Sequence, residues 1–171
     1  VSRRHDSVRL YFLGVEHPSP HVETMKMARD AYELADSLGL RDSVVFFNPG
    51  WVPYDQRADY LLDADLGVST HLDHLETAFS FRTRILDYLW VGLPIVSTDG
   101  DTFGHVIRDN GLGRVVPPND VDALRVALED LLYSDEVRAE TAARVRAFAA
   151  SMTWQTALEP LIEFCRAPRR A

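Results

Sequence analysis

Hydrophobic and polar positions along this 171-residue chain divide it into two kinds of alternating segment. Short apolar runs are typical of buried strands in a parallel sheet, and longer stretches with apolar residues three and four positions apart are typical of amphipathic helices. The runs that predict strands cover residues 8–13, 44–47, 66–69, 95–98 and 113–116. The stretches that predict helices cover residues 21–38, 55–64, 83–91 and 103–110, followed by a helix capped by Asp120 and further helices to the C-terminus.

The alternation of strands and helices predicts an α/β fold, a Rossmann-like doubly wound parallel sheet with helices on both faces. Residues 16–20, 48–50 and 71–79 are expected to be loops. In such sheets, ligands bind outside the carboxyl ends of the strands. We therefore expect the loops after Gly14, Phe47, Ser69 and Thr98 to converge on one edge and to form the binding site.

Composition narrows the class of protein. With 46% hydrophobic residues the chain can bury a core, and residues 1–171 are expected to form one domain. The formal net charge of -8 argues against a nucleic-acid partner, because binding to a phosphate backbone needs a basic face. Cys165 is the only cysteine, which excludes a disulfide within the chain and favours a cytoplasmic setting. No run approaches the roughly 18 apolar residues of a membrane span.

The most informative stretch covers residues 80–98, where a basic loop leads into an amphipathic helix, a Gly-x-Pro stop and a β-branched strand. The start of the helix presents free backbone N–H groups and carries Arg82 and Arg84. This combination attracts a dianionic group such as a diphosphate. Asp87, about one turn further along, can accept hydrogen bonds from neighbouring hydroxyls. A diphosphate beside a diol describes a nucleotide, and we expect a nucleotide sugar.

These residues resemble the C-terminal, donor-binding half of the retaining GT-B glycosyltransferases of group 1 type, which use nucleotide sugars. The segment from Asp87 to Thr98 is similar to the acidic residue, small-residue helix, Gly-x-Pro and strand of that family. Similar motifs follow in the family order over residues 8–164, namely Gly50-Trp51-Val52-Pro53, Ala64-Asp65-Leu66-Gly67-Val68-Ser69, Asn110-Gly111-Leu112-Gly113, Val116-Pro117-Pro118-Asn119-Asp120 and Thr153-Trp154.

The resemblance implies roles for individual residues. Asp87 would bind the nucleotide ribose. The residues implied in diphosphate binding are Ser80, Phe81, Arg82, Thr83 and Arg84. The residues implied in lining the base, mostly by backbone and packing, are Gly50, Trp51 and Val52. Glu76 is the candidate for contact with the donor sugar and so the candidate catalytic residue. No cofactor is expected beside the donor, because arginines and helix N-termini can neutralise the leaving diphosphate.

Three features depart from the family pattern. Phe79 stands where the first of two glutamates separated by seven residues is common, Asp87 stands at the second, and Glu76 is out of register. His105 stands where an acidic residue is common. The chain opens on what resembles the second strand of this half, so the first strand and the N-terminal acceptor domain are expected to be missing. We expect such a fragment to bind nucleotide but to transfer nothing, and any membrane contact to be made by the missing half.

Other interpretations stay open. His71, Asp73, His74 and Glu76 could ligate zinc, but their spacing matches no closed structural site, so we expect no metal. A sugar-nucleotide epimerase of similar two-domain architecture would also bind the diphosphate, and it would need acid and base groups in the cleft. A Rossmann-like module used only for protein association would bind no nucleotide.

Several other residues are expected to have structural and not functional roles. Tyr88, Leu89 and Trp90 are expected to pack their helix against its neighbours, and Trp154 is expected to anchor the C-terminal tail. Glu16 and His17 are expected to be structural loop residues. The acidic residues between 129 and 136, with the arginines after them, are expected to form solvated helix faces.

Overall fold

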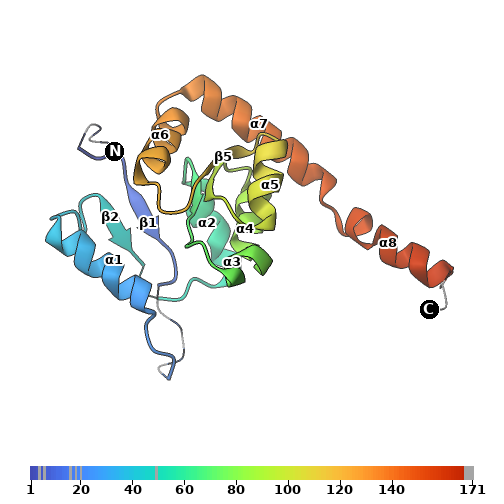
Figure 1. Cartoon of the computed structure of the whole chain (residues 1–171), viewed down its shortest axis with the longest axis horizontal. Helices are drawn as coiled ribbons and strands as arrows, with labels where there is room; N and C mark the ends of the chain where they lie inside the picture. The colour runs from blue at the N-terminus through green and yellow to red at the C-terminus, as the bar shows by residue number, and fades with distance from the viewer. Residues whose placement is uncertain are drawn as a thin grey trace. The chain divides into compact units, whose positions relative to one another are not determined.

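The computed structural model describes residues 1–167 except 4, 6, 16, 18, 20 and 49 (Figure 1). The expected loop residues Glu16, Pro18, Pro20 and Pro49 therefore lie outside the described residues. The chain divides into two compact units, Val1–Asp59 and Tyr60–Ala171, which are called the first and the second unit below. Both units combine parallel strands with helices, so the α/β class expected from the sequence is confirmed.

The first unit is built around a pair of parallel strands. Its elements are β1 (Leu10–Phe12), α1 (Lys26–Ser37), β2 (Val45–Phe47) and the 3-10 helix η1 (Tyr54–Gln56), and α2 (Arg57–Leu62) begins in it and ends in the second unit. Aromatic rings stack across the strand pair, with ring centroids 4.9 Å apart for Phe12 and Phe47. Tyr32 of α1 stacks on Phe47 at 4.0 Å, so aromatic contacts attach the helix to the strands.

The second unit contains a three-stranded parallel sheet in the order β3-β4-β5. Its strands are β3 (Gly67–Ser69), β4 (Ile95–Thr98) and β5 (Gly113–Val116). Its helices are α3 (Leu75–Phe79), α4 (Thr83–Val91), α5 (Thr102–Asp109), α6 (Val121–Leu132), α7 (Asp135–Ser151) and α8 (Trp154–Arg166). All four residues of β4 are buried, as expected for the central strand of a parallel sheet that helices cover.

Helices α4 and α6 cover opposite faces of this sheet. Val96 of β4 belongs to a buried cluster with Val116 of β5 and with Ala127 and Leu131 of α6. Gly67 of β3 lies against Tyr88 of α4, and its register partner is Ile95, the residue before Val96. Because neighbouring residues of a strand point to opposite faces, α4 and α6 lie on different sides of the sheet.

The connection from α4 to β4 has the Gly-x-Pro form that the sequence indicates. Gly92 ends α4 with a φ of 77°, in the left-handed region that favours glycine. Its amide donates to Leu89, and the next amide donates to Tyr88. A Cβ at position 92 would lie 2.7 Å from Cγ of Arg146, so both the backbone and the packing require glycine here.

The bounds of helix 83–91 and of strands 95–98 and 113–116 are as predicted, and the other elements differ at their ends. Helix α1 begins at Lys26 rather than at His21, and β1 is shorter than the apolar run that predicted it. The expected loop 71–79 was wrong in part, because it contains α3. The imidazole Nδ1 of His74 accepts from the amide of Thr77 and caps this short helix.

Residues 152–167, which follow α7, are exposed. Helix α8 (red in Figure 1) has no buried residue, and Trp154 is 82% exposed, so the expectation that Trp154 anchors the tail was wrong. More than half of the surface of Trp90 is exposed, so this side chain packs only in part against its neighbours. Within the part of the chain that the structure describes, no helix combines the length and the apolar character needed to cross a bilayer.

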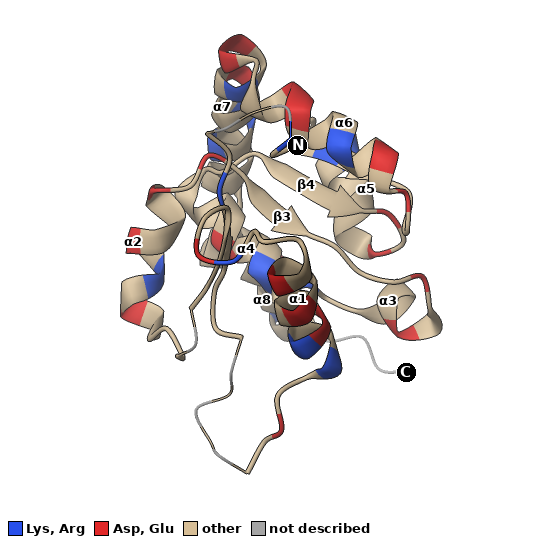
Figure 2. Cartoon of the chain, turned by 90° about the vertical axis from the view of Figure 1, so that its left-hand side faces the viewer, with Lys and Arg blue, Asp and Glu red and all other residues tan. Residues whose placement is uncertain are grey.

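Charged residues of both signs are interspersed along α6 and α7 (Figure 2). Arg125 pairs with Glu129 one turn away at 2.8 Å, and Arg138 pairs with Asp135 at 2.7 Å. Such pairs on helix surfaces contribute little to stability each. These two helices therefore present mixed charge and not a basic face.

Candidate functional site

The start of α4 differs from the starts of most other helices in the described residues. In the capped helices, an N-cap side chain accepts a hydrogen bond from the first turn, the caps being His74, Asp101, Asp120, Ser134 and Thr153. The N-cap of α4 is Arg82, whose side chain makes no such bond. An arginine has only donors, so it cannot accept from the helix amides. The first turn of α4 therefore keeps donors that a ligand can use.

Several predicted residues gather on this turn. Thr83 and Arg84 are exposed, and Asp87 is half-buried. Arg84 and Asp87 are three positions apart, so their side chains lie on one face of the helix. Burial raises the pKa of Tyr88 above its ordinary value, while nearby Arg84 lowers that pKa and Asp87 raises it. Both charges are thus close enough to affect the same phenol.

Arg82 turns inward, toward the sheet edge. Its Nε lies 3.4 Å from Oδ2 of Asp101, a residue just after β4 whose side chain is only 1% exposed. His71, which follows β3, places its Nε2 3.6 Å from the same oxygen. A second guanidinium nitrogen of Arg82 donates to the hydroxyl of Thr77 at 3.3 Å. The guanidinium predicted to bind diphosphate is therefore engaged by the protein.

Two further bonds hold the segment after β3, and one of them reaches the end of β4. The amide of His71 donates to the hydroxyl of Thr98 at 3.0 Å, and the hydroxyl of Thr77 donates to the carbonyl of Leu72 at 2.7 Å. The expected convergence of the loops after Ser69 and Thr98 is confirmed by these contacts. The loops after Gly14 and Phe47 belong to the first unit.

The remaining residues predicted near the diphosphate have local roles. The hydroxyl of Ser80 donates to the carbonyl of Glu76 at 2.7 Å, at the end of α3. Glu76 itself is exposed on that helix. Phe81 is 60% exposed, and its ring centroid is 4.8 Å from that of Phe103. The catalytic role of Glu76 stays a prediction.

The predicted base-lining residues belong to the first unit. The amide of Gly50 donates to Oδ1 of Asn48 at 3.0 Å. Trp51 is about half exposed, whereas Val52 is buried. The guanidinium carbon of Arg57 lies 5.7 Å from the centroid of the Trp51 ring, within cation-π range.

Comparison with known proteins establishes the family. Residues 1–134 match the sequence model of the glycosyl transferases group 1. The chain belongs to this family. It is 32% identical over 127 residues to a phosphatidyl-myo-inositol mannosyltransferase of Mycolicibacterium smegmatis, a match covering 73% of this chain and 31% of that protein. It is 39% identical over 59 residues to the protein of the same name from Mycobacterium leprae, covering 34% of this chain and 16% of that protein.

Two solved structures share the fold. WaaG, a glycosyltransferase involved in lipopolysaccharide biosynthesis, superposes with a TM-score of 0.65 at 23% identity, over 94% of this chain and 38% of WaaG. Sucrose-phosphate synthase from Thermosynechococcus elongatus superposes with a TM-score of 0.68 at 17% identity, over 92% of this chain and 37% of that protein. The chain is thus a domain of the GT-B type, and it spans about a third of the length of these relatives.

Sequence reasoning missed Asp101, although the family pattern drew attention to the residues around it. Its signal was local: an acidic residue three positions before Gly104, just after a buried strand, is typical of a helix N-cap. The structure confirms that cap, because Oδ1 of Asp101 accepts from the amide of Gly104 at 2.8 Å. The contact of its other oxygen with His71 and Arg82 had no sequence signal.

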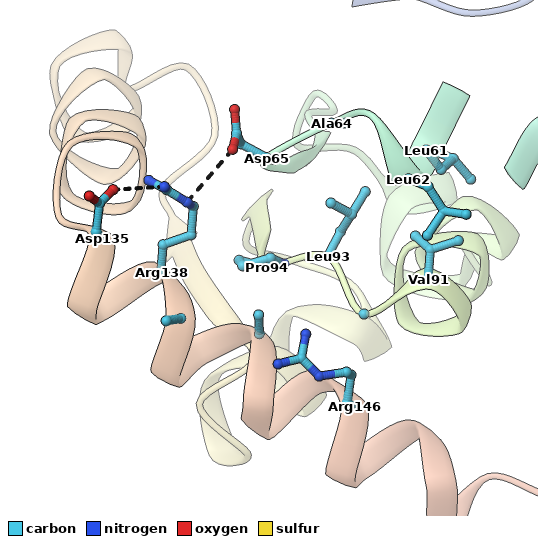
Figure 3. Close-up of a pocket in the computed structure, with 13 residues that line it drawn as sticks. Leu61, Leu62, Ala64, Asp65, Val91, Leu93, Pro94, Asp135, Arg138 and Arg146 are labelled. Carbon is cyan, nitrogen blue, oxygen red and sulfur yellow. Dashed lines mark hydrogen bonds and ion pairs between the residues drawn. The ribbon is translucent and has the colours of Figure 1, made fainter. Parts of the chain in front are cut away.

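A cavity of about 520 Å³ lies elsewhere in the second unit (Figure 3). Asp65 and Pro94, which line it, stand just before β3 and β4, so the cavity is at the amino-terminal edge of the sheet. Arg138 lies at its border and pairs with Asp65 at 3.7 Å. Ligands of open α/β sheets bind at the opposite edge. The cavity is therefore not the site predicted from the sequence.

Two of the residues considered as zinc ligands have other contacts. Among the residues that the structure describes, no three His, Cys, Asp or Glu side chains are grouped so that they could hold a metal ion. His74 is engaged as the cap of α3, and His71 faces Asp101.

Proposed function

We propose that this chain is the donor-binding domain of a retaining glycosyltransferase, and that it binds the diphosphate of a nucleotide sugar at the start of α4. Family membership supports glycosyl transfer as the reaction class. The observation that carries the binding site is the uncapped first turn of α4, with Arg84 exposed beside it.

The first turn of α4 suits an anion for two reasons. Its amides lack a side-chain cap, and the helix dipole places partial positive charge at this end. Arg84 makes no hydrogen bond or ion pair to another described residue, so its guanidinium is available to a ligand. A guanidinium can bind phosphate oxygens in a bidentate manner. Arg84 is therefore the main candidate for side-chain contact with the diphosphate.

Asp87 is the candidate ribose ligand. It is on the face of α4 that carries Arg84, one turn further from the helix start. A carboxylate that accepts from ribose hydroxyls forms charged hydrogen bonds worth about 1.5–3 kcal/mol each. The two residues would thus hold adjacent parts of one nucleotide.

The first unit offers an aromatic surface for the base. Trp51 and Tyr54 are exposed, and Arg57 lies 5.7 Å from the centroid of each ring. Stacking on an aromatic ring accepts any base. As the family resemblance implies, Gly50, Trp51 and Val52 stay the candidates for contact with the base, without a choice of base.

The whole protein would transfer a sugar to an acceptor held mainly by an N-terminal domain outside this sequence. The anomeric configuration would be retained, and Glu76 stays the candidate for contact with the sugar. The names of the two mannosyltransferase relatives make a mannosyl donor and a phosphatidyl-myo-inositol acceptor the first to test. The enzyme would then act at the cytoplasmic surface of a membrane, with membrane contact made outside this domain.

The test is a titration of the isotope-labelled chain with UDP, GDP and ADP, followed by amide chemical shifts. We expect saturable shifts for Thr83, Arg84 and Asp87 with at least one of the three. The absence of binding to all three would contradict the proposal and would favour a module for protein association. Product analysis of the full-length protein separates transfer from epimerisation.

A further inference from the structure

One carboxylate oxygen is the centre of a buried cluster formed by His71, Arg82 and Asp101. Oδ2 of Asp101 is 3.4 Å from Nε of Arg82 and 3.6 Å from Nε2 of His71. The side chains of Asp101 and His71 are 1% and 3% exposed, and that of Arg82 is 28% exposed. These groups are therefore largely removed from solvent.

The cluster is incompletely hydrogen-bonded. In the described part of the chain, Oδ2 of Asp101, Nε of Arg82 and both ring nitrogens of His71 are buried without a hydrogen-bond partner. Burial of charged and polar groups without such partners costs free energy. Groups that a native structure leaves in this state call for an explanation, and one explanation is a functional role.

The three residues come from three segments around the proposed site. His71 follows β3, Asp101 follows β4 and begins α5, and Arg82 is the N-cap of α4. Thr77 of α3 also contacts Arg82 through its hydroxyl. The same hydroxyl donates to the carbonyl of Leu72, in the segment before α3. The contacts of Arg82 therefore connect the first turn of α4 to Asp101 after β4 and to Thr77 of α3.

We propose that Asp101 is a positioning residue, which holds Arg82 and so fixes the first turn of α4 for the donor diphosphate. This inference rests on the proposed function. The two arginines then have different roles. Arg84 contacts the diphosphate, and Arg82 positions the first turn of α4 through its contact with Asp101. His71 supports the carboxylate from the β3 side.

The two oxygens of Asp101 separate this role from helix capping. Oδ1 accepts from the amide of Gly104, while Oδ2 faces Arg82 and His71. Asp101→Asn retains an oxygen for the cap and replaces the charged oxygen by an amide that cannot pair with arginine. Asp120→Asn is the matched control, since Asp120 caps α6 in the same way, its Oδ1 accepting from the amide of Ala123 at 2.8 Å, and is exposed.

The experiment measures the affinity of the full chain for UDP, GDP and ADP and for the corresponding monophosphates by calorimetry. For the nucleotide that binds the unaltered chain best, we expect Asp101→Asn to weaken diphosphate binding about tenfold. Monophosphate binding should change less, because it depends less on the α4 turn. Asp120→Asn should change neither. A merely structural role of Asp101 predicts equal changes in both affinities.

Arg82→Lys keeps the test decisive if Asp101→Asn does not fold. Lysine keeps the charge but lacks the planar fork that reaches Asp101 and Thr77 together. If Arg82→Lys loses as much diphosphate affinity as Arg82→Met, the positioning role is supported. If Arg82→Lys binds about as tightly as the unaltered chain, the positioning role is overturned. If a folded Asp101→Asn variant keeps its affinity for the diphosphate, the positioning role of Asp101 is overturned, while the proposed function is not affected. If the unaltered chain binds none of the nucleotides, the proposed function itself fails.

Discussion

The ring of Tyr88 lies so close to Gly67 that a Cβ at position 67 would come within 2.4 Å of it. The hydroxyl of Tyr88 donates to the carbonyl of Val68 at 3.0 Å. One side chain of α4 thus contacts β3 through its ring and through its hydroxyl. Because the same helix carries the proposed diphosphate site, this contact helps to set the depth at which the site lies on the sheet.

Gly67→Ala should lower the free energy of unfolding by about 1–3 kcal/mol, because the added methyl group overlaps the Tyr88 ring in a packed core. Urea unfolding followed by circular dichroism measures the change. Gly50→Ala is the control, since a Cβ there meets its nearest atom, Oδ1 of Asn48, only at 3.7 Å. Equal stability of Gly67→Ala and the unaltered chain would show that α4 can move away from the sheet freely.

Tyr88 should make stability depend on alkaline pH. Burial raises its pKa above the ordinary value of 10.0, because the phenolate would lose hydration. Above pH 10.0 the unfolded chain releases this proton while the folded chain still holds it, so the free energy of unfolding falls as the pH rises through the folded pKa.

Tyr88→Phe tests this dependence. Below about pH 10 the unaltered chain should be more stable than the variant by about 0.5–1.5 kcal/mol, owing to the hydrogen bond to Val68. That advantage should shrink at higher pH, as measured by urea unfolding at a series of pH values. Tyr11→Phe, at an exposed position, should show no such change. A difference between Tyr88→Phe and the unaltered chain that stays constant with pH would contradict the assignment.

The sequence predicted the features that are determined by residues close together along the chain, and it missed those that depend on residues far apart. Helix 83–91 and strand 95–98 were predictable because their apolar periods and the Gly-x-Pro stop are local signals. Helix α3 was missed because five residues are too short to show a period. The inward turn of Arg82 was also missed, because its partner Asp101 is distant in sequence and only the fold brings them together. The uncapped start of α4, by contrast, could be read from Arg82 itself.

Asp87→Ala should weaken binding of the nucleoside diphosphate at least about tenfold, because it removes a charged acceptor of ribose hydroxyl groups. Calorimetry with UDP, GDP and ADP measures the loss. Asp109→Ala is a suitable control, since Asp109 is exposed at the end of α5. Unchanged affinity in Asp87→Ala would rule out the ribose role, whatever the outcome for the diphosphate.

Arg84→Met should weaken diphosphate binding about tenfold or more, because a charged hydrogen bond contributes about 1.5–3 kcal/mol. The affinity of the variant should also depend less on salt than that of the unaltered chain, since one screened attraction is lost. Arg146→Met is the control: Arg146 lines the cavity at the other edge of the sheet and is exposed. Calorimetry at two salt concentrations gives both quantities.

If Arg84→Met and Arg146→Met bind alike, the diphosphate is held by backbone amides alone or elsewhere. If only Arg82→Met loses affinity while Asp101→Asn does not, the two arginines exchange the roles proposed for them.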